Sequence, residues 1–514
     1  MRKILIVLGL VMVWMGWDVT VPTTYSALQQ TVPAIRQTVT KLTSTRHVKV
    51  QGRQLLVDFD GNGVYEPFII KGVGYSPYPI GRHPSDWDDN IFDNVEILNR
   101  DFDLLQAMGC NTIRIWKGDN TQQADGRFKC KITQKTLDLA QQHNIKVIAG
   151  FWIDTSGAEC IDGYPVYHVP GLSDPTVQNR FGAYVNSLRD LSDADHDGDY
   201  TEIHPAILFW AVGNENNLHL DPANLTQIRA WYSLVNQMAD RAHQIEGASY
   251  HPVAVVNGDL LYAGDANYGT SDAQMNYLDI WGTNVYRGDS FGNLFNDFKN
   301  KSNKPLWIAE YGLDAWYTLD FGNPENGHLD ENSQAQWVAK LWDELSLRHD
   351  VAIGGTVMEY SDEWWKPYEW IDGGIHNNNQ DYFGTGPVDG SCPPDGKIDW
   401  WPPSPDNFFN AEWFGIMAIS LDGSDPDNVD DMHPRMVYNI LKEKFASSVC
   451  GDANNDGKVT ISDVVYLINY LFKGGPAPTH MESADANGDG SITSADCVYL
   501  INYLFKGGPA PKCL

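Results

Sequence analysis

The chain has 514 residues, of which 42% are hydrophobic and 20% are charged, and its formal net charge is −31. This length and composition belong to a folded protein with a large core and exclude an intrinsically disordered chain. The strong negative charge excludes a nucleic-acid-binding protein, because a phosphate backbone would be repelled over most of the surface.

The first 27 residues have the layout of a secretory signal peptide. Two basic residues follow the initial methionine, an apolar run covers 4–17, and small residues near Ala27 offer a cleavage site. The apolar run is short for a membrane span. We therefore predict that residues 1–27 are removed and that the mature protein is secreted or associated with the cell surface, with no membrane segment. An uncleaved anchor is the alternative.

Between residues 50 and 447, short apolar runs alternate with amphipathic segments of helical length. Helices are expected at 98–109, 133–143, 222–247 and 331–349. The apolar runs are FIIKGVGY, NTIRIW, KVIAGFW, AILFWAVG, PVAVVNG, DIWGTNVY, PLWIAEYG and AIGGTVMEY. Eight strands that alternate with helices favour a closed parallel barrel over an open sheet. The sequence therefore predicts an α/β fold, a (β/α)8 TIM barrel, over residues 50–447.

Two acidic stretches within this region imitate calcium-binding loops. The stretch DADHDGDYTEIH has acidic residues at every second position from Asp193 to Asp199 and is a candidate structural cation site. The stretch DFDGNGVYE, with Asp58, Asp60 and Asn62, lies between two strand-like runs. Because Asp-Gly and Asn-Gly pairs are typical of hairpin turns, we interpret this second stretch as a turn.

Two glutamates stand at the ends of apolar runs, where a charged side chain is unexpected in a buried strand. Glu215 comes directly after the fourth apolar run in ILFWAVGNENN, and Glu310 ends the seventh in PLWIAEYG. Barrel enzymes carry their chemistry at the carboxyl ends of the strands, so both side chains are expected at the same mouth. Further candidates at the strand ends are Arg114, Trp152, Asn214 and Tyr286, and the segment after the eighth strand adds Trp364 and Trp365.

The motifs GNEN, AEYG, TIRIW and TNVY resemble those of the retaining glycoside hydrolases of clan A, whose catalytic glutamates follow strands four and seven. The barrel is most similar to that of glycoside hydrolase family 2, with features of family 5 mannanases and beta-1,3-glucanosyltransferases. The resemblance covers about 390 residues, although the sandwich domains that usually precede the family 2 barrel are missing. GNEN also differs from the Asn-Glu-Pro motif common in family 5.

The resemblance implies a double displacement on a beta-linked polysaccharide or oligosaccharide. Glu215 would be the acid/base and Glu310 the nucleophile. Arg114 would keep Glu310 ionised, Tyr286 would donate a hydrogen bond to Glu310, and Asn214 would bind a sugar hydroxyl.

The aromatic candidates are expected to bind sugar rings. The indole faces of Trp364 and Trp365 suit the C–H faces of a sugar, and Trp152 is placed with them as a substrate-binding candidate. Glu359 and Glu363 are interpreted as bystanders or as ligands of a sugar hydroxyl. No cofactor is expected for catalysis.

Two other functions stay open at this point. A transglycosylase would use the same residues to transfer the glycosyl unit to another sugar instead of water. A non-catalytic carbohydrate-binding or scaffold component is disfavoured by the intact pair, Glu215 and Glu310. Mannan, beta-1,3-glucan and beta-galactoside all fit an aromatic cleft with two glutamates.

The C-terminal tail contains a duplicated loop and helix. DANNDGKVTISDVVYLINYLFKGGPAP begins at Asp452, and DANGDGSITSADCVYLINYLFKGGPAP begins 33 residues later. Side-chain oxygens fall at loop positions 1, 3, 5, 9 and 12, and a glycine occupies position 6. Hard oxygen ligands at this spacing predict calcium binding. The predicted ligands are Asp452, Asn454, Asp456, Thr460 and Asp463 in the first copy and Asp485, Asn487, Asp489, Thr493 and Asp496 in the second.

This tail resembles a dockerin, the paired calcium-loop module that docks onto cohesin domains. The resemblance implies a small all-α module over residues 450–514 and a possible cohesin-bearing scaffold as a partner. Cys450 and Cys513 flank the module, so a disulfide between them is plausible. Cys497 takes the place that Val464 has in the other copy, which favours a buried, unpaired thiol.

Overall fold

The computed structural model describes residues 47–82, 91–118, 131–153, 158–161, 164–167, 176–190, 203–320, 322–366, 405–406, 408–420, 429–446 and 448–513. The predicted signal peptide and the acidic stretch from Asp193 to Asp199 lie outside these residues. Within them, no helix is long and apolar enough to cross a membrane.

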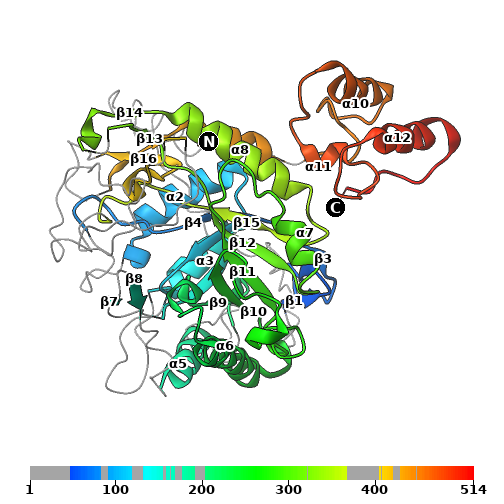
Figure 1. The fold of residues 1–514 in the computed structure, drawn as a ribbon. Helices are drawn as coiled ribbons and strands as arrows, with labels where there is room; N and C mark the ends of the chain where they lie inside the picture. The colour runs from blue at the N-terminus through cyan, green and yellow to red at the C-terminus, as the bar shows by residue number, and fades with distance from the viewer. Residues whose placement is uncertain are drawn as a thin grey trace, which may run out of the picture. The chain divides into compact units, whose positions relative to one another are not determined.

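Eight parallel strands close into a barrel, as the sequence predicts (Figure 1). In chain order they are β4 (Ile70–Gly74), β5 (Thr112–Ile115), β6 (Lys146–Phe151), β9 (Ile207–Val212), β10 (Val253–Gly258), β11 (Ile280–Asn284), β12 (Leu306–Tyr311) and β15 (Ala352–Val357). Each pairs in parallel with the next, and β15 pairs with β4 to close the ring. Their residues are buried almost without exception, which explains the near-continuous apolar runs.

Helices surround the ring of strands (Figure 1). They are α2 (Val95–Met108), α3 (Gln134–Gln142), α5 (Val177–Asp190), α6 (Leu225–Glu246), α7 (Leu294–Lys299), α8 (Glu331–Ser346) and α9 (Met436–Phe445). Helix α2 begins three residues before its predicted start because Asn94 caps it. The Asn94 side chain accepts hydrogen bonds from the backbone amides of Glu96 and Ile97, and this supports a first turn without apolar periodicity.

A short antiparallel sheet precedes the barrel and packs on its interior residues. It contains β1 (Val48–Gln51), β2 (Gln54–Val57) and β3 (Glu66–Pro67), and Val48 and Val57 share one apolar cluster with Phe209 and Trp307 of the barrel. The stretch at Asp58 joins β2 to β3, as the turn interpretation predicts. The remaining strands are short pairs: β7 (Ala158–Ile161) with β8 (Tyr164–Tyr167), β13 (Trp316–Tyr317) with β14 (His328–Leu329), and β16 (Met417–Ser420) with β17 (Asp431–Pro434).

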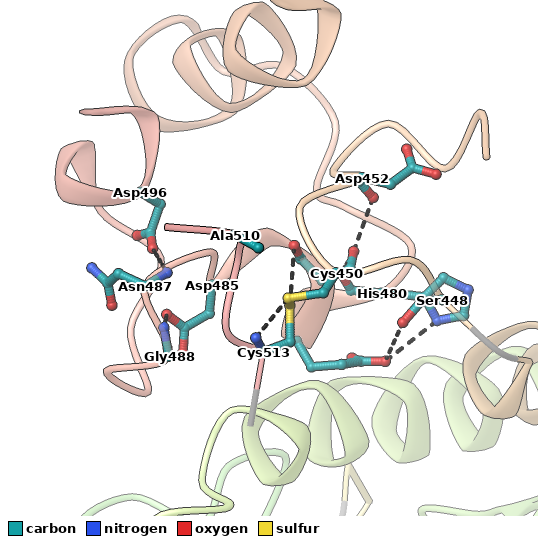
Figure 2. Close-up of a disulfide and its surroundings, with 12 residues drawn as sticks. Ser448, Cys450, Asp452, His480, Asp485, Asn487, Gly488, Asp496, Ala510 and Cys513 are labelled. Atoms are coloured by element: carbon teal, nitrogen blue, oxygen red, sulfur yellow. Dashed lines mark hydrogen bonds and ion pairs between the residues drawn. A yellow bond between two sulfur atoms is a disulfide. The ribbon is translucent and has the colours of Figure 1, made fainter. Parts of the chain in front are cut away.

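The C-terminal region is helical and has a small core of its own. Helices α10 (Ile461–Lys473), α11 (Met481–Ala484) and α12 (Ser494–Lys506) contribute to an apolar cluster centred on Val464, Leu467 and Leu500. The predicted disulfide is present: Cys450 and Cys513 are joined with a Cα–Cα distance of 5.4 Å (Figure 2). Cys497 is buried and unpaired, which confirms the second cysteine prediction.

Candidate active site

The loop after β9 holds Glu215 in an unusual backbone conformation. Glu215 has φ of 56°, in the left-handed region, and Gly213 two residues before it has φ of 67°. A non-glycine residue in this region is held there at a cost of order 1–3 kcal/mol, so the surrounding structure must fix it. The Glu215 amide donates to the carbonyl of Val256 in β10, which ties the residue to the neighbouring strand.

Two asparagines after Glu215 supply the rest of that support. Asn216 is fully buried; its side chain accepts from the amide of Asn214 and donates to the carbonyl of Ile153, after β6. Asn217 is also fully buried and exchanges two hydrogen bonds with the backbone of Gly258 at the end of β10. The polar stretch GNENN thus locks the loop to the strand ends on both sides, and Glu215 is held on a rigid base.

Three side chains donate hydrogen bonds to Glu310, which lies within β12 and is 6% exposed. The guanidinium of Arg114 lies 2.8 Å from Oε1, and the indole Nε1 of Trp116 lies 2.7 Å from the same oxygen. The Tyr286 hydroxyl donates to Oε2 over 3.1 Å. A positive charge and three donors stabilise a carboxylate in this position.

Arg114 connects the two glutamate-bearing strands. It is 1% exposed, and besides Glu310 it donates to the Ala309 carbonyl and, over 2.7 Å, to the side-chain oxygen of Asn214. Because the guanidinium presents several donors in a fixed plane, one residue of β5 contacts both Glu310 in β12 and Asn214 in the loop after β9.

Glu215 has a different environment from Glu310. The side-chain amide of Asn284 donates a hydrogen bond to Glu215, 2.9 Å from Oε1. Burial, together with the charge of Glu310, raises the pKa of Glu215 to about 7, while Asn284 and Arg114 lower it. At neutral pH a substantial fraction of Glu215 therefore carries a proton, whereas Glu310 is surrounded by donors. This difference is what an acid and a nucleophile require of two neighbouring carboxyls.

The structure brings together Arg114, Asn214, Glu215, Tyr286 and Glu310. Trp152 follows β6 at the same end of the barrel and is half-buried. Trp364 and Trp365 follow β15 and are also half-buried, and Trp365 packs edge-on against Tyr78.

Two further residues at the strand ends, to which the sequence assigned no role, contact the glutamates. Trp116 bonds to Glu310, and Asn284 bonds to Glu215. A signal for Trp116 was present in TIRIW: it lies two residues after Arg114, so the period of a strand directs both side chains to the same face. Asn284 ends β11, in TNVY, two residues before Tyr286.

In the C-terminal loops the predicted ligands are ordered by backbone amides in the same way in both copies. Asp452 accepts from the amides of Asp456 and Gly457, and Asp485 accepts from those of Asp489 and Gly490. Gly457 and Gly490 have φ of 84° and 83°, which explains a glycine at position 6.

The last acid of each loop also caps the helix that follows. Asp463 accepts from the amides of Asn454 and Thr460, and Asp496 accepts from those of Asn487 and Thr493. Among the described residues no three acidic, His or Cys side chains converge as a metal site. Each carboxylate oxygen nevertheless has two lone pairs, so it can accept an amide hydrogen and still bind a cation. The oxygen-only donor set fits calcium.

The curated 1,3-beta-glucanosyltransferase PGA4 of Candida albicans is 23% identical over 334 residues, which are 63% of this chain and 62% of that protein. The chain thus spans about 62% of the length of this relative.

Solved structures of two enzymes also match. The Saccharomyces cerevisiae Gas2p complex with laminaripentaose is 14% identical and covers 82% of this chain and 71% of its own, with a TM-score of 0.41. The beta-glucuronidase of Parabacteroides merdae is 12% identical and covers 78% and 41%, with a TM-score of 0.43. At TM-scores this low, the likeness supports no statement about the reaction.

Two families match the chain directly. Residues 450–505 match the dockerin type I domain, in agreement with the duplicated loops. Residues 67–381 match glycosyl hydrolases family 2, TIM barrel domain, and this range contains all eight strands and both glutamates. The chain therefore belongs to the family of glycosyl hydrolases family 2, TIM barrel domain, and carries a dockerin type I domain after the barrel.

Proposed function

We propose that the protein is an exported retaining glycosidase that cleaves beta-linked polysaccharide or oligosaccharide. The observation that carries this proposal is the contrast between the two glutamates: Glu215 has a pKa raised to about 7, and Glu310 accepts from Arg114, Trp116 and Tyr286. Both belong to the barrel of a glycosyl hydrolase family.

In the proposed reaction, Glu310 attacks the anomeric carbon while Glu215 donates its proton to the leaving oxygen. Arg114 and Tyr286 hold the attacking carboxylate in place, and Asn214 is positioned by Arg114 to bind a sugar hydroxyl. Glu215, now ionised, then removes a proton from water, which releases the sugar from Glu310 with retained configuration. Screening neutral beta-linked polysaccharides for released products, with product sizing, tests the activity and identifies the substrate.

A transglycosylase is the second candidate, because the curated relative is named a 1,3-beta-glucanosyltransferase. The two candidates differ only in what accepts the glycosyl unit from Glu310. Products longer than the starting oligosaccharide, formed at high substrate concentration, would identify transfer; products that are only shorter would identify hydrolysis.

The aromatic residues after β15 are proposed to set affinity for long substrates. We expect Trp364→Ala or Trp365→Ala to raise KM for polysaccharide by about tenfold, with a smaller effect on aryl glycosides, because only long substrates reach a stacking platform. Trp337→Ala, at a half-buried tryptophan of the outer helix α8, is the control. Equal losses on short and long substrates would mean that these tryptophans only support the fold.

The dockerin region is proposed to bind two structural calcium ions and to dock onto a cohesin-bearing scaffold. Because binding to the folded state adds to its stability, calcium at 100 times its Kd contributes about 2.7 kcal/mol per site. For a module of this size that predicts a rise in Tm of roughly 10 °C or more.

Circular dichroism of a 450–514 fragment, with and without calcium, measures this effect. Asp452→Ala combined with Asp485→Ala should remove the rise, since each is the first ligand of its loop. Lys473→Ala combined with Lys506→Ala, at the exposed last residues of α10 and α12, is the matched control in the same fragment. A fragment that is equally stable in excess chelator would rule out a structural role for calcium.

A further inference from the structure

Glu359 is a buried acid at the mouth of the barrel that the reaction above does not use. It follows β15 by two residues and has 0% exposure. Neither carboxyl oxygen has a hydrogen-bond partner of normal geometry among the described residues. The Ser76 hydroxyl favours its charged form, but burial and the charge of Glu363 act more strongly against it. An unsatisfied buried carboxyl is costly, so it calls for an explanation.

The backbone of Glu359 is fixed from four directions. The preceding amide, of Met358, donates to Tyr311 of β12, and the following amide, of Tyr360, donates to Gly74 of β4. The Glu359 amide donates to the Phe414 carbonyl, and its own carbonyl accepts from Ile416. These bonds tie the backbone of Glu359 to the seventh and first barrel strands and to residues 414–416.

The carboxyl of Glu359 belongs to the same group of charges as the glutamate pair. It interacts electrostatically with Glu310, and Lys366 interacts with Glu359, Glu310 and Glu215. Lys366 itself is paired with Glu363. The described part of the site contains two cations, Arg114 and Lys366, and both already have carboxylate partners. The carboxyls around them are four: Glu215, Glu310, Glu359 and Glu363.

We propose that Glu359 is a specificity-determining residue that binds a hydroxyl of the sugar unit next to Glu310, and that this unit is a neutral sugar and not a uronate. The inference rests on the proposed glycosidase function. A sugar hydroxyl, which can both donate and accept, supplies the hydrogen-bond partner that the carboxyl lacks. A uronate would add a fifth carboxyl to a site whose described cations are already engaged, and like charges at this range repel.

The test compares enzyme and substrate changes in one cycle. Wild type, Glu359→Ala, Glu359→Gln and the control Glu96→Gln, at an exposed acid of the outer helix α2, are assayed for kcat/KM on aryl beta-glucoside, beta-mannoside and beta-galactoside. The preferred sugar is then tested as its set of monodeoxy analogues. An aryl beta-glucuronide completes the panel, and thermal unfolding verifies that each variant is folded.

We expect one deoxy position to lower kcat/KM of the wild type about 10- to 100-fold, because it leaves the buried carboxyl of Glu359 without a hydrogen-bond partner. In Glu359→Ala this penalty should fall to within about threefold, because its partner is gone; Glu359→Gln should be intermediate. Glu96→Gln should keep the wild-type profile of penalties. The glucuronide should be at least about 100-fold poorer than the preferred neutral glycoside.

Deoxy penalties that are the same in wild type and folded Glu359→Ala would overturn the assignment of Glu359, and a preferred glucuronide would overturn the neutral sugar. Both outcomes leave the proposed function in place, because cleavage is then still observed. If the wild type cleaves no neutral glycoside, aryl or polymeric, the proposed function fails and the inference fails with it.

Discussion

Replacing Glu310 with alanine should lower kcat on polysaccharide by roughly 10⁴-fold or more, because removing a catalytic nucleophile also makes its supporting residues ineffective. The variant keeps Arg114, Trp116 and Tyr286, which all donate to this carboxylate in the wild type. They would surround a cavity that can accept a small anion. The loss is measured by steady-state kinetics on polysaccharide and on aryl glycosides.

Added azide or formate should restore turnover of an activated aryl glycoside by Glu310→Ala. The anion attacks from the side that Glu310 leaves open, so one displacement occurs instead of two and the product has inverted configuration. Glu310→Gln is the comparison variant, because its side chain still fills the space and should respond poorly to azide. A rescued product of retained configuration would show that Glu310 is not the nucleophile.

Replacing Glu215 with alanine should have effects that depend on the leaving group. Natural polysaccharide needs a proton on its leaving oxygen, and loss of a general acid costs about 10²- to 10⁴-fold. Glycosides with good leaving groups, such as dinitrophenyl glycosides, should lose far less in the first step. Azide should then form a glycosyl azide of retained configuration, because it intercepts the intermediate on Glu310. If the patterns of the two variants are exchanged, the roles assigned to the glutamates are exchanged too.

The raised pKa of Glu215 gives this account a pH dependence with a definite sign. The acid acts in its protonated form, so kcat/KM on polysaccharide should fall as the pH rises through about 7. In Asn284→Ala the hydrogen bond that lowers the pKa of Glu215 is lost, so this basic limb should move to higher pH. If the basic limb does not move in Asn284→Ala, the group whose titration it reports is not Glu215.

Much of this fold could be predicted because its strands are buried on both faces. Apolar runs such as PLWIAEYG are easily distinguished from amphipathic helices. The alternation of such runs with helices predicts the barrel, and with it the positions of Glu215 and Glu310 at the strand ends. Contacts between strand ends were harder to predict. Nothing local indicates that Asn284 bonds to Glu215, since this depends on how β9 and β11 are placed in the ring.

Supporting contacts were also hidden in the sequence. Asn216 and Asn217 appeared as polar neighbours of Glu215, yet both are buried anchors of its loop. The start of α2 depended on the cap at Asn94, not on periodicity. Glu359 could be interpreted only loosely as a bystander or a hydroxyl ligand, because its burial results from segments near residues 75 and 414 that lie far away in sequence.

Covalent labelling can identify the nucleophile of this enzyme. An activated 2-deoxy-2-fluoro glycoside of the preferred sugar forms the glycosyl-enzyme quickly and releases it slowly, so the modified residue can be identified by mass spectrometry of peptides. We expect a gain of one fluorosugar on the peptide that contains Glu310, with simultaneous loss of activity, and no label on Glu310→Gln. A label on another residue would contradict a double displacement through Glu310. So would continued turnover of the fluoroglycoside without inactivation if its product has inverted configuration.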